Sequence, residues 1–335
     1  MANKLFVAPS PHVHGPESTQ RIMRDVIIAL LPALVVSAVV FGWDVLRVTA
    51  IAVFSCVLVE YLIQKFLFKG ECTLGNLSAV VTGLLLSFNL PASIPWWIVV
   101  IGSVVAIGIA KMTFGGLGKN PFNPALVGRV FLLIAYPVQM TSFPAVAGSW
   151  TDAFSGATPL AAVKEAMKTG DNGLTRVPET LASLDLGQMF GGQIPGSLGE
   201  VAALALLAGF VYLLWRRVIT WHIPVAVLGT MAVFAFLVAA GRPDMTGAAL
   251  YEFPLFHLLA GGAILGAVYM ATDYATSPMT PKGMIIYGVG IGVITMLIRL
   301  WGSYPEGMSF AILLMNSVTP LLNKYIKPKR FGLKK

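Results

Sequence analysis

The sequence predicts an all-α integral membrane protein with about ten transmembrane helices, arranged as two inverted five-helix repeats separated by a long extracytoplasmic loop. Hydrophobic residues make up 56% of the 335 residues and charged residues only 11%, whereas roughly a quarter of the residues in a soluble domain are charged. The apolar residues gather into runs of about 17 to 25 residues, the length that crosses a bilayer as a helix. A polar stretch over 141–199 separates two sets of five such runs.

The apolar runs set the domain boundaries that we expect. They lie at 25–42, 48–68, 77–92, 96–113, 123–140, 200–219, 222–240, 254–271, 284–301 and 308–325. The chain then divides into a cytoplasmic N-terminal tail, a first membrane repeat, the loop, a second membrane repeat and a basic cytoplasmic tail, at residues 1–24, 25–140, 141–199, 200–325 and 326–335.

The odd number of runs in each set implies that the second set enters the membrane upside down relative to the first. The two sets share a weak pattern, because residues 75–116 and 262–302 each contain an apolar run, a polar break with proline, a second apolar run and a glycine exit. Breaks in corresponding places are typical of transporters that bind a ligand between their repeats. Interrupted backbone inside a bilayer lines a cavity or is covered by protein, since lipid offers it no hydrogen bonds.

The basic residues predict the orientation of the chain. With a cytoplasmic N-terminus, most of them fall at inner loops and ends: Lys4, Arg21, Arg24, Lys65, Lys69, Lys111, Lys119, Arg129, Arg216, Arg217, Lys282 and the basic residues that follow Leu322. The short outer loops carry only Arg47, Arg242 and Arg299. The positive-inside rule then predicts that both termini are cytoplasmic and that the 141–199 loop is extracytoplasmic.

Composition argues against several other functional classes. The formal charge of +8 comes from basic residues at the ends of apolar runs and in the C-terminal tail, so it reflects membrane topology and we expect no nucleic-acid partner. The two cysteines, Cys56 and Cys72, are too few for a disulfide framework or a cysteine-ligated metal site. The first twenty residues lack the apolar core and cleavage site of a secretory signal, so we expect them in the mature protein.

The loop contains "SGATPLAAVKEAMK", in which Thr158 precedes a proline that opens an amphipathic helix. Leu160, Val163 and Met167 follow at helical spacing, so Thr158 has the position of an N-cap and Pro159 that of the first helical residue. One interpretation is a cap alone. The alternative is a covalent attachment point for a phosphate group, because the first turn of a helix presents free N–H groups to an anion.

Two further motifs interrupt apolar runs. "GKNPFNPALVGR" holds Asn-Pro pairs at Asn120 and Asn123, where the prolines break the helix and the amides can cap the freed backbone. "MATDYATSPMTPKG" supplies Asp273 and Thr276 at the corresponding break of the second repeat. A carboxylate inside the membrane or at its boundary is a functional candidate. The alternative is that Asp273 only caps the backbone of the loop.

Glu60 lies inside the apolar run "FSCVLVEYLIQKF". An intramembrane carboxylate is a candidate for an ion pathway. Two structural alternatives are an ion pair with Lys65 and an extended side chain that reaches the inner interface.

The stretches "SPHVHGPESTQRIMRDVIIALLPA", "GGLGKNPFNPALVGRVFLLIAYPVQM", "SGATPLAAVK" and "YMATDYATSPMTPKG" resemble the RnfD component of the Rnf electron-transport complex. They resemble the NqrB component of the sodium-pumping NADH:quinone reductase more distantly. The resemblance covers nearly the whole chain. It implies that Thr158, which closes the motif Ser155, Gly156, Ala157 and Thr158, carries FMN through a phosphoester bond.

The resemblance also implies a non-covalent riboflavin beside the Asn-Pro segment, on the cytoplasmic side. Asn120 and Asn123 become candidates for hydrogen bonds to the flavin ring, because an amide offers both a donor and an acceptor. We place Asp273 and Thr276, at the mirror-related break, with these candidate cofactor-binding residues.

A membrane-embedded flavoprotein subunit is the function that the resemblance implies. It would relay electrons between ferredoxin and NAD, coupled to Na⁺ or H⁺ movement across the bacterial inner membrane, and would catalyse no turnover alone. The implied partners are membrane lipid and the other Rnf components, RnfA, RnfB, RnfC, RnfE and RnfG, especially RnfG, which carries FMN. A secondary transporter or channel with inverted repeats and no redox cofactor is the alternative.

Two departures from the relatives bear on the coupling ion. The third apolar run begins "GNLSAVVTG", without the acidic residue of the sodium-pumping relative. Near the C-terminus the chain reads "PLLN", with Asn323 where relatives often carry a carboxylate. Both departures favour the Rnf component over its relative.

Overall fold

The computed structural model describes residues 18–69, 73–144, 155–156, 158–168, 176–184, 186–192, 196–199, 203–304 and 306–328. Before the loop, the elements are α1 Thr19–Phe41, α2 Trp43–Leu62, η1 Ile63–Phe68, η2 Leu74–Asn76, α3 Ser78–Phe88, α4 Trp96–Val104, η3 Val105–Ile109, η4 Met112–Phe114, α5 Pro124–Ala135, α6 Pro137–Thr141 and β1 Phe143–Pro144. The loop contributes β2 Ser155–Gly156, α7 Pro159–Lys168, α8 Val177–Ser183 and α9 Leu186–Gly191.

After the loop, the elements are α10 Ala203–Trp215, α11 His222–Ala240, α12 Ala249–Leu259, α13 Ala263–Leu265, η5 Gly266–Met270, α14 Pro281–Trp301 and α15 Met308–Tyr325. Helices dominate the described residues, and β1 and β2 form one short antiparallel pair. Each of the ten predicted apolar runs contains a helix or a broken pair of helices.

Five helical stretches in the described part of the chain are long and apolar enough to cross a membrane, and a bent pair adds a sixth. The five are Thr19–Phe41, Trp43–Phe68, Trp96–Phe114, His222–Ala240 and Pro281–Trp301. Outward-facing apolar side chains such as Val39, Phe54 and Leu237 are 80%, 68% and 64% exposed, as expected of surfaces that face lipid. The prediction of an all-α integral membrane protein is confirmed at this level.

The bent pair is α12 followed by α13 and η5, which meet at 57°. Gly261 and Gly262 connect them with φ angles of 68° and 62°, a conformation that costs glycine little. The guanidinium of Arg299 donates hydrogen bonds to the carbonyl oxygens of His257 at 2.6 Å, Ala260 at 2.8 Å and Gly261 at 3.0 Å. A buried arginine therefore satisfies the carbonyl groups that the break leaves free.

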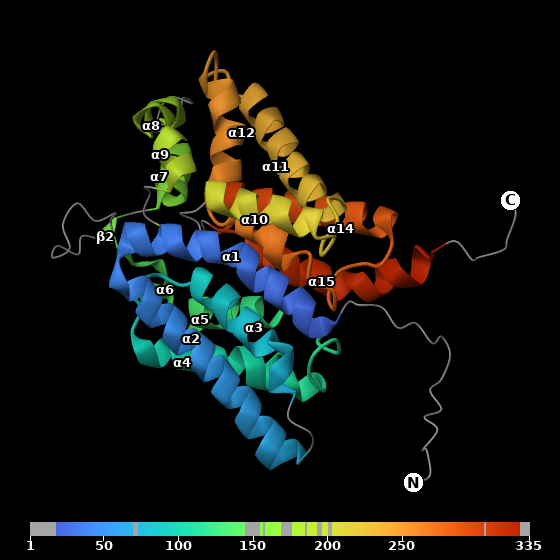
Figure 1. Ribbon diagram of the computed structural model, residues 1–335. Coiled ribbons are helices and arrows are strands. Elements are labelled where there is room, and N and C mark those ends of the chain that lie inside the picture. Colours follow the sequence, from blue (N-terminus) through green and yellow to red (C-terminus); the bar gives the residue numbers. More distant parts are fainter. Residues whose placement is uncertain are drawn as a thin grey trace, which may run out of the picture.

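The parts of the chain before and after the loop pack through α1 and α10, which lie side by side in Figure 1. Gly209 permits this approach, because a Cβ atom there would lie 2.3 Å from the carbonyl oxygen of Ala29. The hydroxyl of Tyr269 donates to the carbonyl oxygens of Leu206 at 3.0 Å and Ala29 at 3.3 Å. The apolar core is continuous across this contact.

The loop helices α7, α8 and α9 form a small cluster beside α12 (Figure 1). Leu160 and Val163 of α7 are buried and Met167 packs against the core, so the predicted amphipathic helix is confirmed. Lys164 Nζ donates to the carbonyl oxygen of Tyr304 at 2.6 Å. This hydrogen bond joins α7 to the segment between α14 and α15.

Candidate functional site

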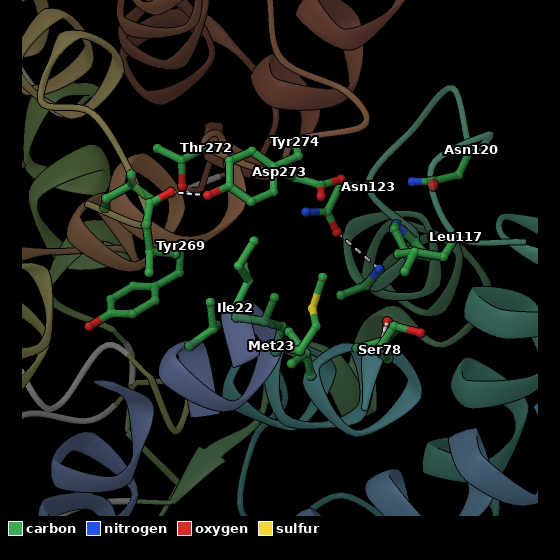
Figure 2. A pocket seen from close by; sticks show the side chains of 18 of the residues that line it. Ile22, Met23, Ser78, Leu117, Asn120, Asn123, Tyr269, Thr272, Asp273 and Tyr274 are labelled. Atoms are coloured by element: carbon green, nitrogen blue, oxygen red, sulfur yellow. Dashed lines mark hydrogen bonds between the residues drawn. The ribbon is translucent and has the colours of Figure 1, made fainter. Parts of the chain in front are cut away.

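One cavity lies where α1, α3, α5, α10 and η5 converge. Counted together with the open space at its mouth, it has a volume of about 770 Å³. Apolar side chains form most of the wall, and Figure 2 shows Ile22 and Met23 of α1 opposite Asn123 and Asp273. We call this space the α1–α5 cavity.

Three of the predicted site residues line the α1–α5 cavity together: Asn120, Asn123 and Asp273. They come from distant parts of the chain, since 147 positions separate Asn123 from Met270, which lies shortly before Asp273. The Asn-Pro segment and the break after η5 therefore bring their polar residues to one place.

Asn123 is held by the helix that it caps. Its Oδ1 atom accepts hydrogen bonds from the backbone N–H groups of Ala125 at 3.1 Å and Leu126 at 3.4 Å, and its Nδ2 atom donates to the carbonyl oxygen of Met270 at 3.2 Å. This confirms the capping interpretation for Asn123. Its amide has little bonding capacity left for a ligand.

Asn120 has an amide oxygen that remains open. Its Nδ2 atom donates to the carbonyl oxygen of Phe122 at 3.0 Å, and the side chain also forms a hydrogen bond with Asp273. Within the described residues, the Oδ1 atom of Asn120 accepts no hydrogen bond. Because the residue lines the cavity, this oxygen is an acceptor for a ligand N–H group.

Asp273 is fixed by short-range contacts. The hydroxyl of Thr276 donates to its Oδ2 atom at 3.3 Å. Burial raises the pKa of the Asp273 carboxyl, and hydrogen bonds from Thr276, the Ala275 backbone and Asn120 oppose this rise, followed by the charge of Lys111. Thr276 is itself 1% exposed and does not line the cavity. Its contribution is the hydrogen bond that it donates to the carboxylate of Asp273.

A buried cation completes the wall of the α1–α5 cavity. Lys111 Nζ lies 2.6 Å from Glu60 Oε2 and donates to Ser78 Oγ at 2.7 Å. The suggested pairing of Glu60 with Lys65 is wrong, because Lys65 donates instead to the hydroxyl of Tyr61. Sequence reasoning counted Lys111 as a cytoplasmic loop residue and missed this pair, although an intramembrane carboxylate calls for a partner.

The second cavity lies beside Thr158 and encloses about 680 Å³ including its opening; we call it the Thr158 cavity. It is lined by residues of α5, α6, β1, α7 and the segment before α15: Arg129, Leu133, Met140, Thr141, Phe143, Thr158, Ala161, Tyr304 and Glu306. Thr158 is 6% exposed. Its Oγ1 atom accepts a hydrogen bond from the Ala161 backbone N–H group at 3.2 Å, so the predicted N-cap is confirmed.

The rest of the predicted motif surrounds this cap. Ser155 and Gly156 form β2, in register with Pro144 and Phe143 of β1 respectively. Ala157 lies outside the described residues. The short pairing brings the backbone that precedes Thr158 against the end of α6.

Arg129 and Glu306 are the charged residues that line the Thr158 cavity, and sequence reasoning gave neither a role there. The guanidinium of Arg129 forms an ion pair with Glu306 and donates to Ser309 Oγ at 2.5 Å. Counting Arg129 as an inner-surface residue is wrong, because its side chain is 8% exposed and lies within α5. It lines the same cavity as Thr158, with its charge paired to Glu306.

Helix α5 connects the two cavities. Asn123 and Pro124 at its start line the α1–α5 cavity, while Arg129 and Leu133 line the Thr158 cavity. The ten positions from Asn123 to Leu133 correspond to about 15 Å along the helix axis. The two cavities therefore lie along one short helix.

Comparison with known proteins gives a match along nearly the whole chain. Residues 6–332 match the model of the NQR2, RnfD, RnfE family. Over 331 residues, 99% of this chain and 96% of the other, the sequence is 49% identical to the D component of the Na⁺-translocating ferredoxin:NAD⁺ oxidoreductase complex of Acetobacterium woodii.

Two further relatives cover the chain equally well. The D component of the proton-translocating ferredoxin:NAD⁺ oxidoreductase complex of Clostridium ljungdahlii is 41% identical over 99% of this chain and 98% of its own length. The D component of an ion-translocating oxidoreductase complex of Escherichia coli is 37% identical over 98% of this chain and 99% of its own length.

Proposed function

The chain belongs to the NQR2, RnfD, RnfE family, and from this premise we propose that it is the membrane-embedded electron-transfer component RnfD of an ion-translocating ferredoxin:NAD oxidoreductase complex. It holds two flavins, one in each cavity along α5. The observation that carries the proposal is that the predicted attachment threonine and the predicted Asn-Pro segment each border a separate cavity.

FMN is joined to Thr158 by a phosphoester bond at Oγ1. Two features of this chain fit a phosphate there: the hydroxyl borders a cavity, and the first turn of α7 provides the positive end of a helix dipole. Arg129 lines the same cavity, paired with Glu306. An ester oxygen still accepts a hydrogen bond, so the contact from the Ala161 N–H group is compatible with the modification.

Riboflavin occupies the α1–α5 cavity without a covalent bond. A flat aromatic ring suits its apolar walls, and the few polar groups differ in what they offer. Asn120 presents an open amide oxygen for a ring N–H group, Lys111 offers one remaining donor, and Asp273 presents a carboxylate. Bound riboflavin accepts and releases electrons, while the side chains orient the ring and exclude water.

Two flavins are needed because the hydrocarbon core of a bilayer is about 30 Å thick. With a single flavin near one surface, an electron would have to cross nearly this whole thickness in one transfer. The separation of about 15 Å between the ends of the two cavities along α5 divides the crossing into shorter transfers. The chain then acts as a relay, and ferredoxin and NAD bind to other components of the complex.

The architecture that suits this relay is two inverted repeats of five spans each. The first helices of the two halves, α1 and α10, pack together, and so do the last, α5 and α15. Leu77 and Gly262 precede the short helices α3 and α13 with φ angles of 63° and 62°. The opposite ends meet where Asn89 Nδ2 lies 3.6 Å from Met270 Sδ.

The partners in this proposal are the other Rnf components, RnfA, RnfB, RnfC, RnfE and RnfG, with the FMN-carrying RnfG facing the flavin on Thr158. Lipid surrounds the exposed apolar faces of α1, α2 and α11. The location is the bacterial inner membrane, with both termini cytoplasmic and the α7–α9 segment outside, as the charge distribution favours.

Flavin analysis of the purified complex tests this function. The chain, produced with its partners and a flavin transferase, should run as a fluorescent band in a denaturing gel, with the mass of one FMN added at Thr158. Acid extraction should release riboflavin in a 1:1 ratio to the chain after other flavins are subtracted. A colourless chain that binds and exchanges a solute instead would establish the transporter alternative.

A further inference from the structure

We infer that Lys111, held in place by Glu60 and Ser78, sets the reduction potential of the flavin in the α1–α5 cavity by presenting a buried positive charge to it. The inference rests on the proposed riboflavin in that cavity. It concerns a buried ion pair for which the relay itself provides no explanation.

The ion pair has a fixed geometry. Lys111 and Glu60 are 2% and 1% exposed, with 2.6 Å between Nζ and Oε2. The second carboxylate oxygen of Glu60 accepts from Gln64 Nε2 at 3.3 Å. Ser78 accepts from Lys111 at 2.7 Å and donates to Asn76 Oδ1, also at 2.7 Å. Every named group is held by at least one neighbour, so the charges cannot easily reorient.

The pair is oriented with its positive end at the cavity. Lys111 and Ser78 line the α1–α5 cavity, and Glu60 does not. A lysine ammonium carries three N–H donors, and the structure gives two of them partners within the described residues. The third donor of Lys111 is therefore available to an acceptor in the cavity, such as a carbonyl oxygen of a flavin ring.

Charge at this position acts strongly because it is buried. Electrostatic interactions weaken with the effective dielectric constant, which is far lower inside a protein than in water. A flavin gains electrons on reduction, so a nearby positive charge stabilises the reduced form and raises its potential. The carboxylate of Asp273, which also lines the cavity, acts in the other direction.

Stability alone gives little reason for such a pair. Buried ion pairs contribute weakly to folding compared with apolar side chains of similar volume, because both charges lose their hydration. Removing one partner leaves the other charge uncompensated next to the cavity. The two single substitutions therefore change the local charge in opposite directions while disturbing the same contact.

The test is a redox titration of riboflavin in the assembled complex, followed by absorbance, with riboflavin content measured in the same samples. Lys111→Met leaves the Glu60 charge and should lower the potential, whereas Glu60→Gln leaves the Lys111 charge and should raise it. Each should change the ratio of reduced to oxidised riboflavin at fixed potential by at least about tenfold, which is about 30 mV for a two-electron couple. The matched control is Lys65→Met, which removes an exposed lysine bonded to Tyr61 and should leave the potential unchanged.

Opposite shifts of the two variants support the inference. Shifts in the same direction, or none, with riboflavin retained, overturn it and leave the proposed function standing. Absence of riboflavin from the wild-type complex overturns both. If Lys111→Met does not assemble, Glu60→Gln decides the question, since an unchanged or lower potential contradicts the role given to Lys111.

Discussion

Asn123 and Met270 join the two halves of the chain, because the Nδ2 atom of Asn123 donates a hydrogen bond to the carbonyl oxygen of Met270 at 3.2 Å. Asn123 caps α5 and Met270 ends η5. Both residues lie at breaks in helices, where free backbone groups need partners. The side-chain amide of Asn123 therefore forms hydrogen bonds with backbone groups at both breaks, beside the α1–α5 cavity.

The first prediction concerns Asn123 as a structural residue. Asn123→Leu removes the cap, which costs about 1 kcal/mol, and leaves the Met270 carbonyl without its donor, which costs about 1–3 kcal/mol. The thermal unfolding temperature of the purified complex should fall. Asn123→Ser keeps a capping oxygen and should recover part of the loss; equal losses for both substitutions would contradict the capping role.

The second prediction separates flavin binding from folding by means of Asn120. Asn120→Leu removes the open amide oxygen, so one hydrogen bond of about 1 kcal/mol is lost and riboflavin should bind roughly fivefold more weakly. Covalent flavin at Thr158 should be unchanged. The measurement is riboflavin retained after dialysis. Full retention together with full electron transfer would leave the Asn-Pro segment with a structural role only.

The third prediction is that Thr158→Val abolishes the covalent flavin and leaves an inserted, assembled chain, because the lost cap costs only about 1 kcal/mol. Thr158→Ser retains a hydroxyl and should retain some label. Thr141 offers a matched control, since its hydroxyl lines the same cavity but bonds to its own helix at Pro137. Thr141→Ala should keep full labelling, and intact mass measures all three variants.

The sequence was sufficient to predict the helices and the capped threonine because their signals are local. Apolar runs of sufficient length predict the helices. Pro159 directly after Thr158 indicates where α7 begins. The resemblance grouped Asn120, Asn123 and Asp273 as candidate cofactor-binding residues, and the structure places them at one cavity.

Long-range partners of charged residues were not predictable in the same way. Lys111 and Arg129 look like ordinary positive-inside residues when only their positions in the sequence are known. The structure turns both inward, toward Glu60 and Glu306. Their roles depend on which helices are neighbours in space, and apolar periodicity carries no information about neighbours.

The fourth prediction concerns Arg299, whose guanidinium binds three carbonyl oxygens at the α12–α13 bend. Arg299→Met leaves these buried acceptors unsatisfied, at about 1–3 kcal/mol for each, and should lower the unfolding temperature sharply or prevent assembly. Arg47→Met is the matched control, because Arg47 forms an exposed pair with Asp44 and such pairs contribute little. Equal stability of the two variants would show that the bend does not depend on Arg299.

The fifth prediction concerns orientation. Lys111, Arg129 and Arg299 are buried and hydrogen-bonded, so they carry no topological information. Without them, the short outer loops keep Arg47 and Arg242, and the inner segments keep the larger share of basic residues. The excess of basic residues on the predicted inner side therefore remains when these three buried residues are left out.

Reporter fusions measure this orientation directly. A cytoplasm-specific reporter fused after Lys335 should be active, and a periplasm-specific reporter inserted after Ser183, at the end of α8, should be active there and silent at the C-terminus. Because α7 and α8 pack together, the second fusion also reports the side on which Thr158 is exposed to a flavin transferase. The reverse pattern at both sites would invert the chain, and electrons would then enter the relay from the flavin on Thr158.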